Sequence, residues 1–432
     1  MTLVEHLTSL GIDQNEFLND IKGSYQPGFI QIRLKESYNG NLEELSISEL
    51  GTFLHEYIHY LQNVSTPWGL FSSMVMYNRM VDTYSYIQST TETIHLPLNI
   101  SYSKPLENKA KIVSLGNGDH PLLNNFCNVI DRNKPIIWKR HRETVGDKKL
   151  ETVSLTIHTA DGSTREVRLG AYIIKESMAA LYQMQIDSSA SHRKCDLPYN
   201  LIKIMAEQKF PQIAEDDVKL ITICYISLFS LSPAVTLIEQ LDFANQHPCY
   251  SAKDLFDLFM NESTIKINDK QNIPITDFFD DLIEKFKIIL SKAIQVKLDY
   301  INEILNRIKP SKGFVPILSI LYSGTLTVDK IKTLVDFLGM PYIYTDMGES
   351  HYPKSVENEN EASNDMIALI GHSSLFNYLV SPNVHKCCPL KIICMKENVE
   401  KEECFEKPWA GKVCSMTIMG ELLELENKNF NW

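Results

Sequence analysis

The sequence predicts an α+β fold that is mostly helical, and three patterns lead to this prediction. Residues 197–309 show almost unbroken helical periodicity. Residues 29–34 alternate apolar and polar side chains, as a half-buried strand does, and residues 151–169 have the pattern of a β-hairpin. The chain has 432 residues, which is enough for a sizeable core and fits two or three domains.

The elements at the start of the chain follow from local signals. Ser46 and Glu49 have the spacing of a capping box, and the apolar residues after them fall on one face of a helix. Pro67 and its neighbours predict the end of that helix and a turn. In chain order we expect a short helix at 1–22, a strand at 29–34, a turn at 39–41, a helix from 46, a stop and turn at 65–69, and a helix at 70–89.

The middle of the chain is less regular. Residues 92–148 contain strand-like pieces at 96–100 and 112–115 and several turns, which is typical of a lid or an insertion. The hairpin at 151–169 turns at Asp161-Gly162, and Gly170 then opens a helix that runs to about Ile186.

The remainder predicts mainly helices. The longest uncharged stretch, 220–238, contains six Ser, Thr or Pro residues and lacks basic flanks, which favours a buried helix, broken near Pro233, over a membrane span. In chain order we expect a long amphipathic helix at 276–309, a helix at 328–338, a short strand-like piece at 342–344 and an exposed polar loop at 355–365. The predicted domains are a core of residues 1–195, a helical domain of 196–310 and a mixed, cysteine-rich region of 311–432.

The composition of the chain limits the classes of partner that the protein can have. The formal net charge of −12 argues against nucleic acid and against an acidic membrane surface as the main partner. We see no secretory signal at the N-terminus, and nine cysteines, an odd number, then predict reduced thiols and a cytoplasmic location. Five of the nine follow His385 near the C-terminus, where free thiols are favoured over a second metal site: Cys387, Cys388, Cys394, Cys404 and Cys414.

The most informative motif is His55-Glu56-Tyr57-Ile58-His59, because it has the form H-E-x-x-H. Two residues four apart lie one turn apart on the same face of a helix, so both imidazoles can reach one metal ion. Glu56 lies beside that ion without ligating it, where a general base for a metal-activated water belongs. The motif therefore predicts a hydrolytic zinc site with Zn²⁺ as its cofactor.

A catalytic zinc usually has three protein ligands, and the third distinguishes the families. The metzincin pattern, H-E-x-x-H-x-x-G-x-x-H, would place a glycine at position 62 and a third histidine at position 65. It is excluded, because these positions hold Gln62 and Ser65. A carboxylate on a second helix remains. We prefer Glu176 over Asp82, because a carboxylate among buried apolar residues is costly unless it is paired or metal-bound. Glu176 could instead form a structural salt bridge with an Arg or Lys.

The helix with His55-Glu56-x-x-His59 and the later Glu176-x-x-Ala179 resemble the gluzincin class of zinc metallopeptidases. The resemblance covers about 35 residues and implies a zincin-like catalytic core with a small β-sheet and a large helical C-terminal part. It also implies a strand at the cleft edge, for which residues 29–34 are in place, and a Tyr or His that assists the oxyanion. The candidates for that assisting residue are Tyr172, His158, His192, Tyr322, His351 and His372, and Gln62 is a candidate outer hydrogen-bond partner of the zinc site.

These observations predict a cytoplasmic zinc endopeptidase that cleaves a specific intracellular protein. Glu56 would be its general base, and a regulatory protein would be a further partner, as for a bacterial effector or defence protease. Two alternatives stay open: a catalytically inactive zinc-binding scaffold, and a metal hydrolase that acts on something other than a peptide. The sequence leaves the substrate, the cleavage site and the oligomeric state undetermined.

Overall fold

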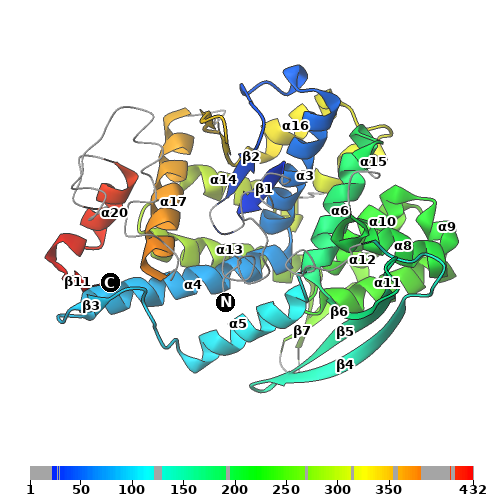
Figure 1. The fold of residues 1–432 in the computed structure, drawn as a ribbon, viewed down its shortest axis with the longest axis horizontal. Helices are drawn as coiled ribbons and strands as arrows, with labels where there is room; N and C mark the ends of the chain where they lie inside the picture. Colours follow the sequence, from blue (N-terminus) through cyan, green and yellow to red (C-terminus); the bar gives the residue numbers. More distant parts are fainter. Residues whose placement is uncertain are drawn as a thin grey trace.

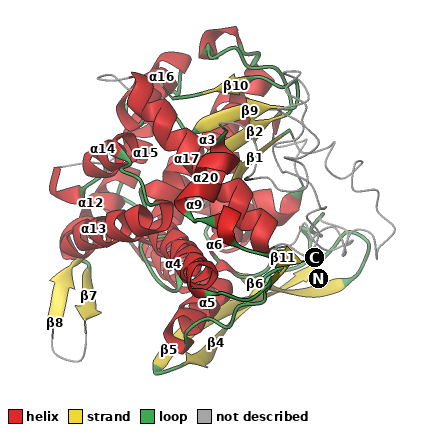
Figure 2. Cartoon of the chain, turned by 90° about the vertical axis from the view of Figure 1, so that its left-hand side faces the viewer, coloured by secondary structure: helices red, strands yellow, loops and turns green. Residues whose placement is uncertain are grey.

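The structure is a computed structural model that describes residues 22–26, 28, 30–120, 129–190, 195–267, 271–312, 316–353, 359–380, 409 and 414–431. Helices predominate in this part and the sheets are small, so the prediction of a mostly helical α+β fold is confirmed (Figures 1 and 2). Buried side chains from Ile30 to Leu425 join in one continuous hydrophobic cluster.

The elements of the N-terminal part are β1 (Gly23–Gln26), β2 (Gln31–Leu34), η2 (Leu42–Glu44), α3 (Ile47–Val64), α4 (Pro67–Ser89), β3 (Ile94–His95), α5 (Lys104–Asn117), β4 (Ile137–Val145), β5 (Lys148–His158), β6 (Thr164–Leu169), α6 (Ala171–Ile186) and η4 (Asp196–Asn200). Those of the remainder are α8 (Leu201–Lys209), α9 (Pro211–Ala214), α10 (Asp217–Ser227), α11 (Pro233–Gln246), α12 (Ala252–Glu262), β7 (Thr264–Ile267), β8 (Gln271–Pro274), α13 (Ile275–Ile294), α14 (Asp299–Arg307), η6 (Pro310–Lys312), α15 (Pro316–Tyr322), α16 (Val328–Leu338), β9 (Tyr342–Thr345), β10 (Ser350–His351), α17 (Glu359–Val380), α20 (Ser415–Leu422), η7 (Leu425–Asn427) and β11 (Phe430–Asn431).

The sheet beside α3 joins two distant parts of the chain. Its strand order is β1-β2-β9-β10, with β2 parallel to β9 and the outer pairs antiparallel. Ile32 of β2 pairs with Ile343 of β9, and both side chains are fully buried. The predicted strand at 29–34 therefore begins at Gln31 and lies inside the sheet, and the strand-like piece at 342–344 is its neighbour.

The helix with the H-E-x-x-H motif forms as predicted. The Glu49 backbone N–H donates to Ser46 Oγ at 3.3 Å, and the Ser46 backbone N–H donates to Glu49 Oε2 at 2.8 Å, which completes the capping box. The predicted helix stop is confirmed, because α3 ends at Val64. The turn predicted after it is wrong, because Pro67 occupies the first position of α4 and Thr66 caps that helix. Gly69 allows the two helices to meet closely, since a Cβ there would lie 2.2 Å from the Asn63 carbonyl oxygen.

The hairpin prediction is confirmed by β5 and β6, and β4 adds a third strand. Within 92–148, however, the strand predicted at 112–115 is helical and belongs to α5. Ile112 and Leu115 are three residues apart, so in a helix both face Val145 and Leu150 and bury a small apolar cluster. The piece at 96–100 is also not a strand, since β3 ends at His95.

Among the later helices, one break was not expected from the sequence and another agrees with the prediction. The predicted helix 276–309 is divided into α13 and α14 at Gln295, whose φ of +58° is left-handed. The break predicted near Pro233 in the stretch 220–238 is confirmed, since α10 ends at Ser227 and Pro233 starts α11. No helix among the described residues has the length and apolar character needed to cross a membrane. The predicted helix 328–338 is confirmed as α16.

Two C-terminal predictions are only partly covered. The polar loop predicted at 355–365 overlaps the start of α17, which begins at Glu359. Of the cysteine cluster, Cys414 caps α20 by accepting from the Thr417 N–H. The other four cysteines of the cluster, Cys387, Cys388, Cys394 and Cys404, lie outside the described residues. The helix predicted at 1–22 also lies outside them, except for Lys22.

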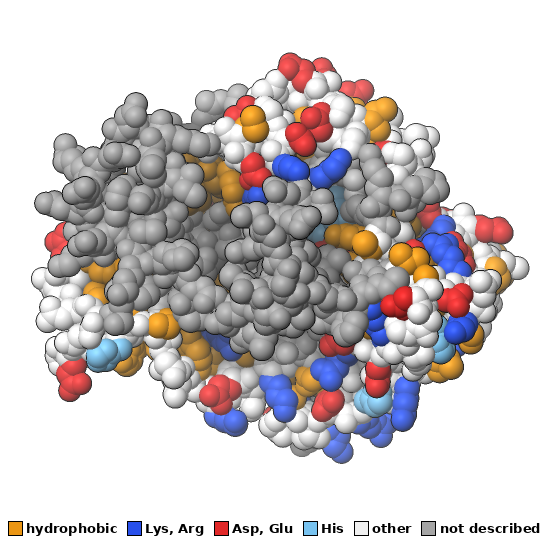
Figure 3. Space-filling view, in the orientation of Figure 1, with side chains coloured by type: hydrophobic (Ala, Val, Ile, Leu, Met, Phe, Trp, Pro, Cys, Tyr) orange, Lys and Arg blue, Asp and Glu red, His pale blue; other side chains and the backbone are white. Residues whose placement is uncertain are grey.

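The charges of the acidic chain are unevenly distributed. In the space-filling view, Lys and Arg side chains gather along the lower margin, where Figure 1 places the β4–β5–β6 sheet (Figure 3). Arg140 and Arg142 of β4 are paired with Glu151, and Arg140 also with Glu239. Because these two arginines are paired within the chain, the basic margin is partly neutralised.

Candidate metal centre

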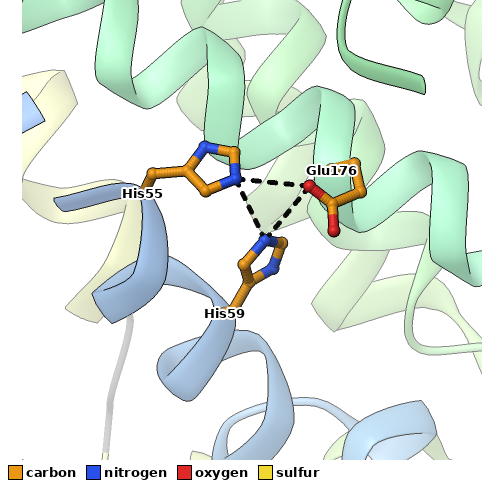
Figure 4. Close-up of side chains that lie close together, drawn as sticks. All are labelled: His55, His59 and Glu176. Carbon is orange, nitrogen blue, oxygen red and sulfur yellow. Dashed lines mark hydrogen bonds and ion pairs between the residues drawn. The ribbon is translucent and has the colours of Figure 1, made fainter. Parts of the chain in front are cut away.

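Three side chains from two helices converge at one point. His55 and His59 project from α3, and Glu176 projects toward them from α6 (Figure 4). The two Nε2 atoms are 3.2 Å apart. Glu176 Oε2 lies 3.2 Å from His55 Nε2 and 3.4 Å from His59 Nε2, so the three atoms form a nearly equilateral triangle.

This triangle has the size that a tetrahedral metal requires. Ligand atoms at about 2.0–2.1 Å from a zinc ion are separated by about 1.63 times that length, or about 3.3–3.4 Å, in tetrahedral geometry. The measured edges of 3.2, 3.2 and 3.4 Å agree with this separation. Two imidazoles and one carboxylate are also a donor set that zinc accepts. Among the described residues, this is the group of three that can hold a metal ion.

The approach of α6 to α3 brings Glu176 into the group. Small side chains at this contact, Ala179 and Ala180 on α6 and Gly51 on α3, are buried. A Cβ at Gly51 would lie 3.2 Å from atoms of Asp187 and Gln183. Glu176 is thereby the carboxylate that the structure adds to the histidines, and the alternative, Asp82 on α4, does not belong to the group.

Burial and mutual charge make the group a coupled unit. The exposed fractions of the side chains are 6% for His55, 11% for His59 and 15% for Glu176. Burial alone would raise the pKa of the Glu176 carboxyl, but the two histidines outweigh burial and hold it well below its usual range. Burial alone would lower the pKa of His59. The negative charge and hydrogen bond of the Glu176 carboxylate are the main causes that act against burial, and the pKa of His59 is raised. A positive charge at this point is therefore stabilised.

Gln62 links the two helices behind the histidines. His59 Nδ1–H donates to Gln62 Oε1 at 2.9 Å, and Gln62 Nε2 donates to the Lys175 carbonyl oxygen on α6 at 3.0 Å. The amide can only be oriented in this way, since its NH₂ must face the carbonyl. The bond to Nδ1 places the proton there and leaves the Nε2 lone pair directed at the metal position.

We therefore expect Gln62→Ala to weaken zinc binding by about 10- to 100-fold, because His59 loses the partner that fixes its tautomer and ring orientation. Competition with a fluorescent zinc chelator measures the affinity. Gln185→Ala on the same α6 helix is a matched control, because that amide bonds to Asp217. Unchanged zinc affinity in Gln62→Ala would contradict the assignment.

Two tyrosines and a histidine surround the group. The Tyr199 ring on η4 packs edge-on against the His55 ring, with centroids 5.9 Å apart. Tyr172 on α6 stacks on His120 at 3.8 Å. Burial, followed by the charge of Glu176, raises the pKa of both tyrosines. The side chain of His120 is exposed, and its partial desolvation lowers the pKa of His120 despite the charge of Glu176. All three side chains are therefore neutral near pH 7 and can donate hydrogen bonds.

Backbone contacts place two of these rings. Ser177 Oγ donates to the Pro198 carbonyl oxygen at 2.8 Å, which ties η4 to α6 beside Tyr199. Asp119 N donates to the Arg168 carbonyl oxygen at 3.0 Å, which holds the end of α5 and His120 over the start of α6. A Cβ at Gly170 would lie 2.3–2.4 Å from the backbone of residues 117–118, so glycine is needed at this crossing. The lid or insertion predicted at 92–148 therefore reaches the site through the end of α5 and the residues after it.

The chain matches no family model, no curated protein and no solved structure. A functional argument for it therefore depends on the site itself.

The other candidates lie elsewhere. His158 pairs with Thr164, five residues before the end of β6 that adjoins α6, which is about 16 Å along the strand. Both ring nitrogens of His372 are occupied in the core, by the Tyr84 hydroxyl and the Ile294 carbonyl oxygen. His351 packs on Tyr38 at β10. Tyr322 is at the end of α15, which packs against α10. His192 lies outside the described residues.

Glu56 is buried between α3 and the sheet, with 6% of its surface exposed. Its negative charge contributes to the raised pKa of His59, Tyr172 and Tyr199, so the carboxylate lies near the three candidate ligands. The strand nearest to it is β1, the outermost described strand of the sheet. The expectation that 29–34 forms the cleft edge is wrong, because β2 is paired on both sides, and β1 takes the outer position.

Proposed function

We propose that this protein is a zinc-dependent peptidase whose ligands are His55, His59 and Glu176. The observation that carries the proposal is the triangle of two Nε2 atoms and one carboxylate oxygen, with edges of 3.2–3.4 Å, together with a second carboxylate, Glu56, close to it. A purely structural zinc site has no need of Glu56.

Glu56 has the role of general base in this proposal. When bound, zinc would supply an activated water by lowering its pKa toward about 7, and it would polarise the scissile carbonyl. Glu56 takes the proton of the attacking water and passes it to the nitrogen of the leaving amine. Its buried position, in contact with little solvent, keeps the carboxylate directed at the reacting water.

The neutral donors around the site support an acyl-transfer reaction. Negative charge develops on the carbonyl oxygen as the peptide is attacked, and preorganised donors stabilise it. Tyr199, which lies against a ligand ring, is the strongest candidate for this hydrogen bond, and Tyr172 with its stacked partner His120 is the second.

The shape of the site supports a restricted substrate. An extended peptide could add to the outer edge of β1 and so pass over Glu56. The ligands themselves are almost buried, and α5 and η4 reach over them, which favours a specific protein substrate over general digestion. We accordingly propose a narrow substrate range and control by a protein partner, as in a regulated effector or defence protease.

A peptide library tests this proposal. We expect the protein with one equivalent of zinc to cleave a small subset of peptides, detected by mass spectrometry. Cleavage should fall to background after chelation, since the water then loses its activation, and zinc should restore it. Prompt degradation of unfolded casein would contradict the narrow range. Zinc-loaded protein that cleaves no peptide but hydrolyses small non-peptide esters or amides would favour the metal-hydrolase alternative.

A further inference from the structure

We propose that Gly23 is a positioning residue for Glu56, and that the missing side chain at this point sets where the carboxylate lies. This inference depends on the proposed peptidase function. A Cβ built on Gly23 would lie 2.8 Å from Glu56 Cγ, 3.0 Å from Oε1 and 3.2 Å from Cδ. Gly23 is not among the glycines with positive φ. Space, and not backbone conformation, therefore requires glycine here.

The strand cannot easily move away to make room. Tyr25, two residues along the same face of β1, packs edge-on against Tyr60 of α3 at 6.3 Å. Asn63 Nδ2 donates to the Tyr25 hydroxyl at 3.2 Å, and the Ser73 hydroxyl donates to Asn63 Oδ1 at 3.2 Å. On the other side of Gly23, the Lys35 backbone N–H donates to the Lys22 carbonyl oxygen at 2.8 Å. The strand is thus held on α3 through Tyr25 and on the end of β2 through Lys22, one on each side of Gly23.

Because β1 is held, a methyl group at residue 23 must displace Glu56. Ordinary contact for a Cβ begins at 3.4 Å, so the side chain would have to move by about 0.6 Å at Cγ. Glu56 is only 6% exposed, so its displaced carboxylate has to move within a packed interior. Misplacement of a catalytic group by about 1 Å is enough to cost about 10²-fold in rate.

Kinetics on Gly23→Ala test the inference. We expect kcat to fall by about 10- to 10²-fold with little change in KM and unchanged zinc content, because only the transition state uses the position of Glu56. Gly420→Ala in α20 is a matched overpacking control, since a Cβ on Gly420 would lie 2.2 Å from Trp409 Cβ, far along the chain from the site. It should lower stability and leave kcat unchanged. Wild-type kcat in Gly23→Ala would overturn the inference.

A second measurement does not use activity. Urea unfolding of the zinc-free protein is compared for wild type, Gly23→Ala, Glu56→Ala and the double variant. We expect Gly23→Ala to lower the unfolding midpoint when Glu56 is present and to have no effect when residue 56 is alanine. If Gly23→Ala lowers the unfolding midpoint equally with Glu56 and with alanine at residue 56, the inferred contact between residues 23 and 56 is overturned. If wild type cleaves no peptide, the proposed function fails, and this cycle alone decides whether Gly23 positions Glu56.

Discussion

Glu56→Gln should keep its zinc and lose its activity. Gln has the size of Glu but no basic oxygen, so it cannot accept the proton of the attacking water. General-base catalysis contributes about 10²- to 10⁴-fold, and we expect kcat to fall by that amount. The ligand triangle does not include Glu56, so the zinc content by elemental mass spectrometry should stay at about one per chain. Both quantities are measured on the same preparation.

The control for this variant is Glu49→Gln on the same helix. Glu49 belongs to the capping box, and a Gln at that position also supports the motif, so both activity and stability should remain close to wild type. Full activity of Glu56→Gln would contradict the proposed mechanism. If wild type and Glu56→Gln bind zinc equally and neither cleaves any peptide, the scaffold alternative, in which the metal only supports the fold, is favoured.

The parts of the site that the sequence predicted depend on local information. The positions of His55, Glu56 and His59 on one helix follow from spacing, and the capping box at Ser46 sets where that helix begins. Glu176 was a physical inference from a carboxylate among apolar neighbours, and the structure brings it to the histidines. The helices and the hairpin at 151–169 are likewise predicted from the period at which apolar residues recur along the chain.

The residues that the sequence did not reveal reach the site through long-range packing. Tyr199 comes from a short segment tied to α6 by Ser177. His120 comes from the loop just after α5, a helix whose sequence pattern is partly that of a strand. No spacing in the chain connects either residue with the H-E-x-x-H motif. The sheet illustrates the same limit, because the edge position of β1 depends on β2 pairing with β9, more than 300 residues later.

Removing either kind of ligand should abolish tight zinc binding. We expect His59→Ala and Glu176→Ala to weaken zinc affinity by more than the about 10- to 100-fold that loss of an outer hydrogen-bond partner costs, because each removes one of three direct bonds. Zinc should also stabilise the wild type by about 2.7 kcal/mol when free zinc is 100 times Kd, and the variants much less. Thermal unfolding with and without zinc, together with metal content, measures both effects.

Asp82→Ala is the control, because Asp82 was the alternative third ligand and lies outside the group. It should bind zinc as wild type does. Zinc retained in His59→Ala would place the metal elsewhere, with the C-terminal cysteines as the first candidates. Zinc retained in Glu176→Ala but lost in Asp82→Ala would reverse the choice of carboxylate and contradict the triangle.

The pH dependence of binding gives an independent check, since protons and zinc compete for the same atoms. The pKa of His59 is raised, so its proton must be displaced at pH values above the ordinary range of histidine, and zinc affinity should fall as the pH falls through that value. The zinc-free protein shows the opposite sign for this group: protonated His59 contributes stability at low pH and loses it as the pH rises through the folded pKa. Glu176, with its lowered pKa, contributes stability above the unfolded pKa of a carboxyl and loses it on acidification.

Zinc titrations in buffers of different ionisation enthalpy should show proton release on zinc binding in wild type, because zinc displaces the proton of His59. A binding reaction that releases no protons and is independent of pH would exclude His59 as a ligand.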